Sequence, residues 1–481
     1  MLVRSDDIET YLTDASFIPG GYADRVVLPE SVDEVAEVLA GASRDRVPVT
    51  VSGAGTGTVG GRVAFGGIVL ATERLNRIRS IVRGRGVAEA GVILADYQRA
   101  VESEGQLYPP DPTERGCFLG GTVATNASGA RTFKYGPTRN YISGLKVVLA
   151  SGEVLDLKRG EVRADSDGRM RVGSVEVHLP ELTRPATRKN ATGYFVAPEM
   201  DAIDLFIGSE GTLGVICEIE TRLLPKPEGL LSGVVFFTDE ADVLALVAQV
   251  RGHVDAQLPR ALEFFDAESL NFLRQKYPTI PEPAVAALFF EQETTVANEE
   301  SVVEQWLTLL DQHHALADSW FAANATDQAK LREFRHQLPV LMNEWFARYR
   351  QRKVSTDMAV PDDAFPGLFR LYQETLRASG LRYTIFGHIG DNHVHVNILP
   401  RDDAEGARAR NIYVQFLKHA AAAGGTLSAE HGVGKLKRDY LRLFYSDTQL
   451  RALASLKRTL DPHGILGRGN IFSESLLSEV R

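Results

Sequence analysis

A glycine-rich loop after a predicted strand constrains this fold more than any other feature of the sequence. Residues 52–61 read Ser-Gly-Ala-Gly-Thr-Gly-Thr-Val-Gly-Gly and follow the β-type run 47–51. Glycines let backbone N–H groups converge on an anion because no Cβ stands in the way. The loop lacks the following helix and acidic residue of the Rossmann fingerprint, and the lysine of the P-loop. It predicts a dinucleotide site of another kind, with a merely flexible turn as the alternative.

The N-terminal third predicts a βαβ beginning that continues into a mixed sheet. Ser31 followed by Glu34 is a capping-box pattern, so a helix should begin there, between β-type runs at 25–28 and 47–52. The β-type runs at 67–70, 78–82 and 87–93 are too closely spaced for crossover helices, which favours a mixed sheet over a doubly wound one. Further strand-rich segments are expected at 141–157 and 203–224. The prolines of Leu224-Pro-Lys-Pro227 suggest a domain boundary.

After this boundary the periodicity changes to two strand–helix–strand cycles, followed by long helices. The cycles lie at 231–237, 239–250 and 261–265, and at 285–291, 298–313 and 315–321. Helical patterns then cover 326–350, 365–378, 408–423 and 447–460. We expect a separate α+β domain in which helices cover one face of the sheet.

Composition limits the class of protein. A chain of 481 residues with 44% hydrophobic residues can form two or three structural units. Its net charge of -10 argues against a general nucleic-acid binder. Cys117 and Cys217 are too few and too far apart for a thiolate metal centre. Without an apolar signal core or a bilayer-length apolar run, we expect a cytoplasmic protein.

Two further segments predict a slot for a flat ring and its phosphates. The first runs from Tyr108-Pro-Pro-Asp111-Pro-Thr113 through Leu119-Gly-Gly-Thr-Val-Ala-Thr125-Asn126-Ala-Ser-Gly129 to Lys134-Tyr-Gly-Pro-Thr-Arg139. The second is Ile207-Gly-Ser-Glu-Gly-Thr-Leu-Gly-Val-Ile216. Rigid prolines, small residues and hydroxyls at this density leave backbone as the wall of a narrow site.

Imidazoles and carboxylates concentrate in two short runs near the C-terminus. These are Gly387-His-Ile-Gly-Asp-Asn-His-Val-His-Val-Asn397 and Ser428-Ala-Glu-His-Gly-Val-Gly434. Neutral imidazoles plus a carboxylate form the usual first shell of a catalytic divalent metal with an open position. The alternative is a set of scattered polar residues on surface turns. Four or five candidates in two glycine-flanked runs favour a metal or catalytic site.

These motifs, in this order, resemble the vanillyl-alcohol-oxidase-type flavoproteins. The runs at 387–397 and 428–434 resemble the D-2-hydroxy-acid dehydrogenase branch of that family. The resemblance as a whole covers the chain from about Val26 to Phe472. The resemblance implies an α+β protein with a two-part, PCMH-type FAD-binding domain, a substrate or cap domain and a C-terminal segment that returns to the flavin. We expect these parts at residues 1–226, 227–430 and 431–481.

By this resemblance the glycine loop would bind the FAD diphosphate, and residues 110–113, 120, 121, 125, 126 and 129 of the first of these segments would line the isoalloxazine and ribityl groups. Glu210, Gly214 and Ile216 would complete the adenine side. No histidine stands at 52–61, so the flavin should be non-covalent. The expected cofactor residues are Ser52, Gly53, Ala54, Gly55, Thr56, Gly57, Gly60, Gly61, Pro110, Asp111, Pro112, Thr113, Gly120, Gly121, Thr125, Asn126, Gly129, Glu210, Gly214, Ile216 and Asn470. The last stands in a C-terminal ending, Gly-Arg-Gly-Asn, that departs from the family pattern.

The resemblance also implies a zinc or manganese site at His388, His395 and Glu430. Seven residues separate the two histidines, and the turn at 390–392 would bring them together. If 394–399 is a strand, residues 393, 395 and 397 share a face.

The implied catalytic residues are His431 as general base, with Asn397, Arg335 and Lys353 toward the substrate. Arg335 would bind a carboxylate, or lie on a solvated helix face. Lys189 would stand in the substrate-side wall. His393 replaces a family asparagine; it could be a further ligand, a proton shuttle or an outward-facing turn residue, and we expect the last.

The implied reaction is oxidation of a D-2-hydroxy acid of the lactate, glycolate or 2-hydroxyglutarate type to its 2-oxo acid. The external electron acceptor would be electron-transfer flavoprotein, a quinone or a cytochrome. The protein could also form a homodimer. One alternative is an FAD oxidase for sugars or alcohols that lacks a catalytic metal. Others are a metal-dependent hydrolase with a nucleotide loop and a non-catalytic flavoprotein. The sequence does not identify the acid, the acceptor or the metal.

Overall fold

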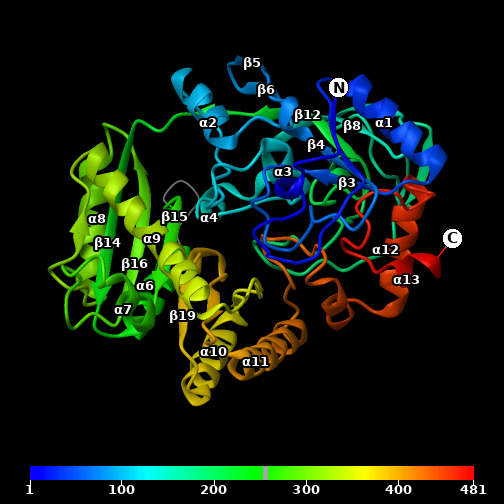
Figure 1. The fold of residues 1–481 in the computed structure, drawn as a ribbon. Coiled ribbons are helices and arrows are strands. Elements are labelled where there is room, and N and C mark those ends of the chain that lie inside the picture. The colour runs from blue at the N-terminus through cyan, green and yellow to red at the C-terminus, as the bar shows by residue number, and fades with distance from the viewer. Residues whose placement is uncertain (253–257, 481) are drawn as a thin grey trace.

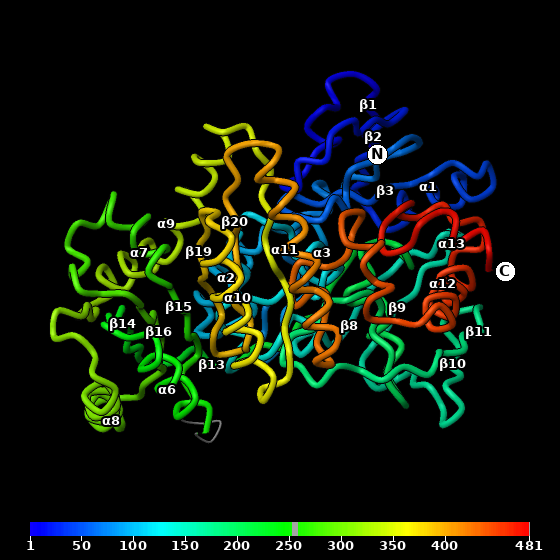
Figure 2. Tube along the Cα trace, turned by 90° about the horizontal axis from the view of Figure 1, so that it is seen from below, coloured from blue at the N-terminus to red at the C-terminus, as the bar shows by residue number. Residues whose placement is uncertain are grey.

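The chain folds into two packed parts, with the C-terminus returning to the N-terminal part. The structure is a computed structural model that describes residues 1–252 and 258–480. Figure 1 shows the blue and cyan elements together with the red C-terminal helices in one part, and the green and yellow elements in the other. Figure 2 shows the same division from below, with both termini in the first part.

The first sheet is mixed and has the order β1-β2-β4-β3, formed by Leu2–Arg4, Arg25–Leu28, Ile68–Ala71 and Val49–Ser52. Strands β2, β4 and β3 are parallel, and α1 (Val32–Asp45) connects β2 to β3. The predicted helix start is confirmed, because the Ser31 hydroxyl accepts from the Glu34 N–H at 3.2 Å. Only half of the capping box forms, since the Glu34 carboxylate accepts from the N–H of Glu30 instead.

A second, antiparallel sheet has the order β5-β6-β12-β8-β9, formed by Ile78–Val82, Arg85–Glu89, Val215–Arg222, Ile142–Val148 and Val154–Lys158. The strands predicted for one mixed sheet therefore form two sheets. Helices α2 (Leu94–Ser103) and α3 (Leu119–Ala124) pack on the second sheet through a shared apolar core. The strand expected from residue 203 is wrong at its start: Ile203–Phe206 is helix α5, and β12 begins only after the turn at glycines 208, 211 and 214.

Short elements complete this part of the chain. Two-stranded pairs join β7 (Gln106–Leu107) to β13 (Leu224–Pro225) and β10 (Arg169–Val172) to β11 (Val175–His178). Its short helices among the described residues include α4 (Thr132–Tyr135), η1 (Glu9–Tyr11), η2 (Thr72–Arg74), η3 (Thr138–Tyr141) and η6 (Arg438–Leu443). The short helix η5 (Ile389–Asp391) belongs to the second part, between β19 (Tyr383–Gly387) and β20 (His395–Ile398).

The second part is built on a seven-stranded antiparallel sheet. Its order is β17-β14-β16-β15-β19-β20-β18, formed by Trp320–Phe321, Gly229–Phe237, Ala286–Thr294, Ala261–Phe265, Tyr383–Gly387, His395–Ile398 and Val354–Ser355. The predicted strand 315–321 contributes only its last two residues. All seven strands lie within the predicted substrate domain, residues 227–430, whose exact boundaries remain predictions.

Helices cover both faces of this sheet, so the expected one-sided cover is wrong. The apolar side chains of β14 alternate: Val235 and Phe237 join one cluster with α6, α8 and α10, while Val234 and Phe236 join another with α7 and α9. A strand that is apolar at successive positions must bury both faces. The helices are α6 (Glu240–Arg251), α7 (Ala267–Leu273), α8 (Glu299–Gln312), α9 (Ala325–Tyr349), α10 (Phe365–Ser379) and α11 (Asp403–Ala422).

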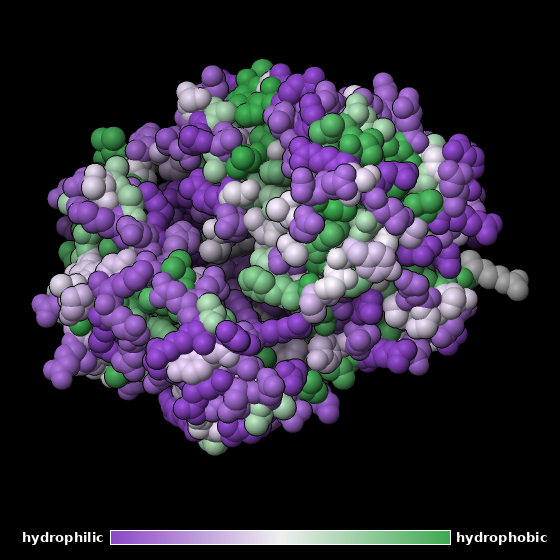
Figure 3. Space-filling model, in the orientation of Figure 1, coloured by the Kyte–Doolittle hydropathy of each residue, from purple (hydrophilic) through white to green (hydrophobic). Residues whose placement is uncertain are grey.

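The C-terminal segment packs against the first sheet. Helices α12 (Asp447–Leu460) and α13 (Glu474–Ser478) flank a turn that pairs with the start of β3. The Val49 N–H donates to the Ile465 carbonyl at 2.8 Å, and the Gly467 N–H donates to the Val49 carbonyl at 2.9 Å. No helix in the described residues is both long and apolar enough to span a bilayer. The surface is hollowed between the two parts of the molecule (Figure 3).

Candidate functional site

A tight reversal between β19 and β20 brings His388 and His395 together. His388 follows β19, His395 begins β20, and Phe386 pairs with His395 across the two strands. Gly387, at the end of β19, has φ +117°, and a Cβ built there would lie 3.0 Å from the His395 ring. Glycine is therefore needed where the chain leaves β19.

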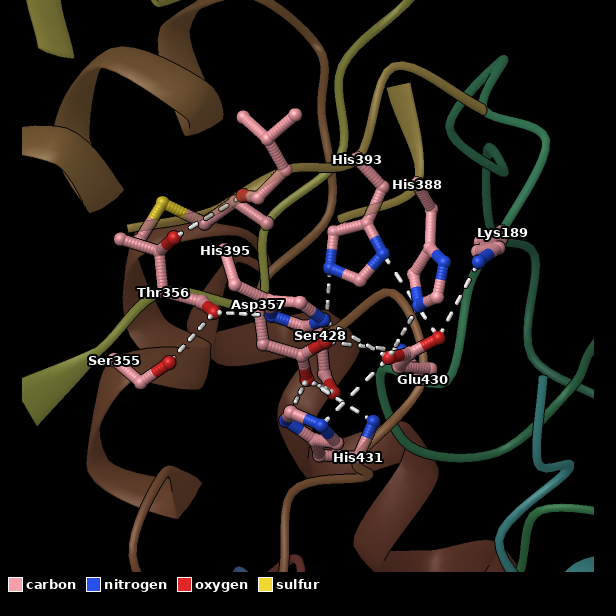
Figure 4. A network of polar contacts seen from close by, with 12 residues as sticks. Lys189, Ser355, Thr356, Asp357, His388, His393, His395, Ser428, Glu430 and His431 are labelled. Carbon is pink, nitrogen blue, oxygen red and sulfur yellow. Dashed lines mark hydrogen bonds and ion pairs between the residues drawn. The ribbon is translucent and has the colours of Figure 1, made fainter. Parts of the chain in front are cut away.

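Both imidazoles present the same nitrogen to one carboxylate oxygen (Figure 4). The Nε2 atoms of His388 and His395 lie 3.2 and 3.1 Å from Oε1 of Glu430. Each Nδ1 faces an acceptor: Glu263 Oε1 at 2.6 Å for His388, and the Thr356 carbonyl at 3.1 Å for His395. Such partners fix the tautomer in which Nε2 carries the free lone pair. The three predicted metal residues therefore converge with donor atoms suited to a divalent cation.

The local field favours positive charge at this point. Burial opposes the charged form of His388, but the carboxylates of Glu263 and Glu430 outweigh burial and raise the pKa of His388 to about 9. The Glu430 carboxylate also forms an ion pair with Lys189, whose Nζ lies 3.3 Å away. A metal cation between the two Nε2 atoms would take the place of the proton that the carboxylates of Glu263 and Glu430 stabilise on His388.

Lys189, expected in the substrate-side wall, lies buried against the carboxylate of Glu430. Its side chain is wholly buried, and its ammonium group contacts the Gly129 carbonyl at 3.0 Å and Asp391 at 3.2 Å besides Glu430. A buried ammonium requires such paired partners, which explains its position behind the cluster. Lys189 thereby links the first part of the chain to both histidine-bearing runs.

His431 lies beside the cluster and retains access to solvent, with 29% of its side chain exposed. Its Nδ1 is 3.4 Å from Oδ2 of Asp357, and its Nε2 is 3.7 Å from Oε1 of Glu430. Burial lowers the pKa of His431 to about 4, against the opposing effect of the Asp357 and Glu430 carboxylates. The ring is therefore neutral near pH 7, as a general base must be.

Asp357 organises the turn that carries Glu430 and His431. Its carboxylate accepts from the backbone N–H groups of both residues, at 3.2 and 3.1 Å. It also accepts from the hydroxyl of Ser428 and the ammonium group of Lys437. Sequence reasoning missed Asp357 as a site residue, although it lies four positions after Lys353. Its buried contacts come from segments distant in sequence, which no local pattern reveals.

The predicted flavin loop has the groups that a diphosphate needs. No backbone N–H of residues 54–61 donates a hydrogen bond within the described part of the chain. Gly55 and Gly60 have φ +83° and +76°, and a Cβ on Gly60 would lie 2.1 Å from Ile18. Convergent, unpaired backbone donors on such a loop form an anion-binding concavity. Arg62, which sequence reasoning missed, closes the loop from behind by donating to the carbonyls of Gly53 and Thr13, each at 2.7 Å.

The C-terminal half contacts this loop directly. Asn470 donates to the Gly61 carbonyl at 2.7 Å and accepts from Lys435 at 2.6 Å. The Glu210 carboxylate accepts from the N–H groups of Val433 and Gly434, both at 2.7 Å. Glu210 thus ties the segment 207–216 to the turn that carries the catalytic candidates. Its predicted contact with the adenine remains a prediction.

The other predicted flavin residues lie in neighbouring segments. Gly120 and Gly121 lie on α3, followed by Thr125 and Asn126, and the Glu210 N–H donates to the Ala124 carbonyl at 2.8 Å. A Cβ on Gly129 would lie 2.0 Å from the Asp111 carbonyl oxygen, so this glycine packs directly on the predicted 110–113 wall.

Gly214 and Ile216 belong to the entry into β12. A Cβ on Gly214 would lie 2.6 Å from Val147 in β8, so packing within the second sheet explains this glycine. Ile216 is buried in the core of the same part. Their predicted contact with the adenine remains a prediction.

Comparison with known proteins identifies the fold's family. A family model for the C-terminal domain of FAD linked oxidases matches residues 226–471, and a model for an FAD binding domain matches residues 23–158. The chain belongs to the FAD-linked oxidases. It is an FAD-linked oxidoreductase with the α+β, vanillyl-alcohol-oxidase-type architecture that the motifs predicted.

Three curated relatives align over nearly the whole chain. D-lactate dehydrogenase of Anaerostipes hadrus is 31% identical and covers 98% of this chain and 94% of its own. Glycolate oxidase subunit GlcD of Bacillus subtilis is 30% identical, with 95% and 90% covered. D-2-hydroxyglutarate dehydrogenase of Xanthomonas citri pv. viticola is 32% identical, with 93% and 89% covered. A solved alkyldihydroxyacetonephosphate synthase has the same fold, with a TM-score of 0.69, 17% identity, and 97% and 83% covered.

The remaining catalytic candidates of this FAD-linked oxidase lie around the same cluster. Arg335, on α9, is buried, so a solvated helix face is wrong; its Nε lies 3.1 Å from Oε2 of Glu263. Asn397, on β20, is also buried, and its amide has no hydrogen-bond partner among the described residues. An orphaned buried amide is costly unless a ligand satisfies it. Lys353 is exposed, and no described contact joins it to the histidines.

His393 is buried, with 0% of the side chain exposed, so the expected outward-facing turn is wrong. The chain does not continue as an extended strand from residue 393. Asn392 has φ +55°, and the His393 N–H donates back to the His388 carbonyl at 3.2 Å. This turn points the ring inward, toward Glu430 and Asp357.

Proposed function

We propose that the protein oxidises a D-2-hydroxy acid of the lactate, glycolate or 2-hydroxyglutarate type to the 2-oxo acid. The observation that carries the proposal is the convergence of two imidazole Nε2 atoms on Glu430 beside a neutral His431. The names of the relatives support the substrate class. When bound, non-covalent FAD would accept the C2 hydride, and zinc or manganese would chelate the substrate carboxylate and 2-hydroxyl.

His431 would remove the proton of the 2-hydroxyl group. A proton on Nδ1, which faces Asp357, leaves Nε2 free to accept, and Nε2 is the nitrogen nearer Glu430. A base oriented by a buried carboxylate is the usual arrangement for this step. The nearly parallel His395 ring, 5.3 Å away between centroids, limits rotation of His431.

Arg335, Asn397 and Lys353 would bind and orient the substrate. Arg335 uses Nε toward Glu263 and Nη1 toward His336, which leaves Nη2 for a carboxylate. Asn397 has both amide atoms available within a buried site. Lys353 carries an accessible charge that suits the distal carboxylate of a diacid.

Electrons would leave to electron-transfer flavoprotein, a quinone or a cytochrome. A cytoplasmic location, a homodimer and the division of the chain after residues 226 and 430 belong to the same proposal. The competing function is an FAD-dependent sugar or alcohol oxidase in which the histidines are structural. The buried, oriented donor set at Glu430 favours the hydroxy acid. Structural histidines would not need Glu263 and the Thr356 carbonyl to orient both Nε2 atoms toward the same carboxylate.

Anaerobic mixing with a panel of D- and L-2-hydroxy acids tests the proposal. We expect a D-2-hydroxy acid to abolish the flavin absorbance at a rate that exceeds those of its L-enantiomer and of sugars. Bleaching by sugars or simple alcohols alone would contradict the proposal and support the oxidase. A purified protein without flavin, which FAD does not restore, would contradict both.

A further inference from the structure

We propose that His393 is a ligand of the same cation as His388, His395 and Glu430, so that three imidazoles and one carboxylate hold it. This inference rests on the cation-dependent function proposed above. It assigns a metal-binding role to His393, which stands where the family motif has an asparagine. One donor atom from each of the four residues lies within 4.8 Å of the others.

The Nδ1 atom of His393 is a buried polar atom without a hydrogen-bond partner among the described residues. The other ring nitrogen, Nε2, lies 3.3 Å from Oδ1 of Asp357. Leaving a buried polar atom unsatisfied costs about 1–3 kcal/mol, so native structures rarely keep one. We therefore expect Nδ1 to meet a partner that the polypeptide does not supply, in the space beside Glu430 toward which two other imidazoles already point.

The two nitrogens of His393 face different groups. Nδ1 lies 3.9 Å from Oε2 of Glu430, and Nε2 lies 3.3 Å from Oδ1 of Asp357. An Nε2–H group that donates to Asp357 leaves the Nδ1 lone pair on the Glu430 side. Figure 4 shows this ring between the two carboxylates.

The same arrangement occurs at all three histidines. Each ring places one nitrogen toward Glu430 and the other toward a carboxylate or carbonyl oxygen, which are Glu263, Thr356 and Asp357 in turn. A histidine that binds a metal almost always has its second nitrogen paired in this way. A residue that only filled space would not need an acceptor placed behind it.

The distances are close to those of a bound ion. Zinc–nitrogen bonds of about 2.0–2.1 Å place tetrahedral ligand atoms about 3.4 Å apart. The Nε2 atoms of His388 and His395 already lie 3.2 and 3.1 Å from Oε1 of Glu430. No two of the four donor atoms are more than 4.8 Å apart, so the widest pair would close by at most about 1.4 Å. The His393 and His395 ring centroids are already 4.5 Å apart.

The added imidazole changes what the site selects. Imidazole nitrogen suits zinc, whereas carboxylate, carbonyl and water oxygens suit manganese. Replacing an amide by a third imidazole should therefore shift the preference toward zinc.

Zinc titration of the full-length flavoprotein, without substrate, tests the inference. The variants are His393→Asn and His393→Gln, with His395→Asn as the positive control and His419→Asn, an exposed position on α11, as the negative control. Zinc affinity is measured by competition with a chelator, and X-ray absorption at the zinc edge counts imidazole ligands. Flavin absorbance and thermal unfolding report whether each variant folds.

We expect three imidazoles on zinc in the wild type and two in His393→Asn. The zinc affinity of His393→Asn should fall by more than the roughly 10–100-fold that is typical when a residue hydrogen-bonded to a metal ligand is replaced. The preference for zinc over manganese should also decrease. Two imidazoles in the wild type, or unchanged affinity in His393→Asn, would overturn the inference, because neither outcome depends on a variant that fails to fold. Three imidazoles in a protein that no hydroxy acid bleaches would support the inference and contradict the proposed function.

Discussion

Glu263 connects the substrate-binding candidate Arg335 to the metal-binding candidate His388. One carboxylate oxygen lies 2.6 Å from Nδ1 of His388, and the other lies 3.1 Å from Nε of Arg335. The residue is on β15 and only 2% exposed. Its charge therefore acts on the imidazole with little screening by solvent.

Replacement of Glu263 by glutamine keeps the shape and one acceptor but removes the charge. His388 should become a weaker donor toward the cation, because the carboxylate no longer raises the basicity of the ring. Partners of this kind change metal affinity by about 10–100-fold. We therefore expect zinc binding to weaken by about 1.4–2.8 kcal/mol.

Chelator competition on purified wild-type and variant protein measures this change. Glu291→Gln is the matched control, because Glu291 is a buried glutamate on the neighbouring strand β16 that pairs with Arg260 at 2.7 Å and does not contact the histidines. Both variants break a buried ion pair and should unfold more easily than the wild type. Equal zinc affinity in Glu263→Gln and the wild type, or an equal loss in Glu291→Gln, would refute the reasoning.

Three other variants follow from the structure. Burial raises the pKa of Asp266 to about 7, whereas an unfolded Asp titrates near 3.9. Ionisation of Asp266 therefore favours the unfolded chain as the pH rises. The urea midpoint should fall from pH 5 to 7 more steeply in the wild type than in Asp266→Asn. His431→Gln should slow anaerobic flavin reduction by about 10²–10⁴-fold without loss of flavin or zinc, and an unchanged rate would exclude it as the base. Gly129→Ala should lower the flavin-to-protein ratio, because its Cβ would meet the Asp111 carbonyl at 2.0 Å; Gly367→Ala, with no atom within 4 Å, should retain flavin.

Strong local signals predicted individual elements well. The helix start at Ser31 and the strands 78–82 and 261–265 follow the predicted bounds, because caps and apolar periodicity act within a few residues. The cover of the seven-stranded sheet was mispredicted, since which helices share a face depends on contacts between distant segments. The strand at 315–321 shrank to two residues because only Trp320 and Phe321 reach the edge of β14.

The site was predictable where it depended on motifs. His388, His395 and Glu430 converge as expected, and His431 lies beside them. Asp357 and Glu263 were not found, because each is a single carboxylate, one just after β18 and the other on β15, whose partners come from elsewhere in the chain. His393 was assigned to the surface because a turn usually faces solvent, whereas a left-handed residue at 392 turns this ring inward.

In the proposed reaction, a cation at His388, His395 and Glu430 and the base His431 together activate a 2-hydroxy acid for hydride transfer to flavin. The decisive measurement is the rate of anaerobic flavin bleaching by a D-2-hydroxy acid before and after a chelator removes the cation. We expect bleaching to stop in the cation-free flavoprotein and to return when zinc or manganese is added. Equal bleaching rates with and without the cation would contradict the account.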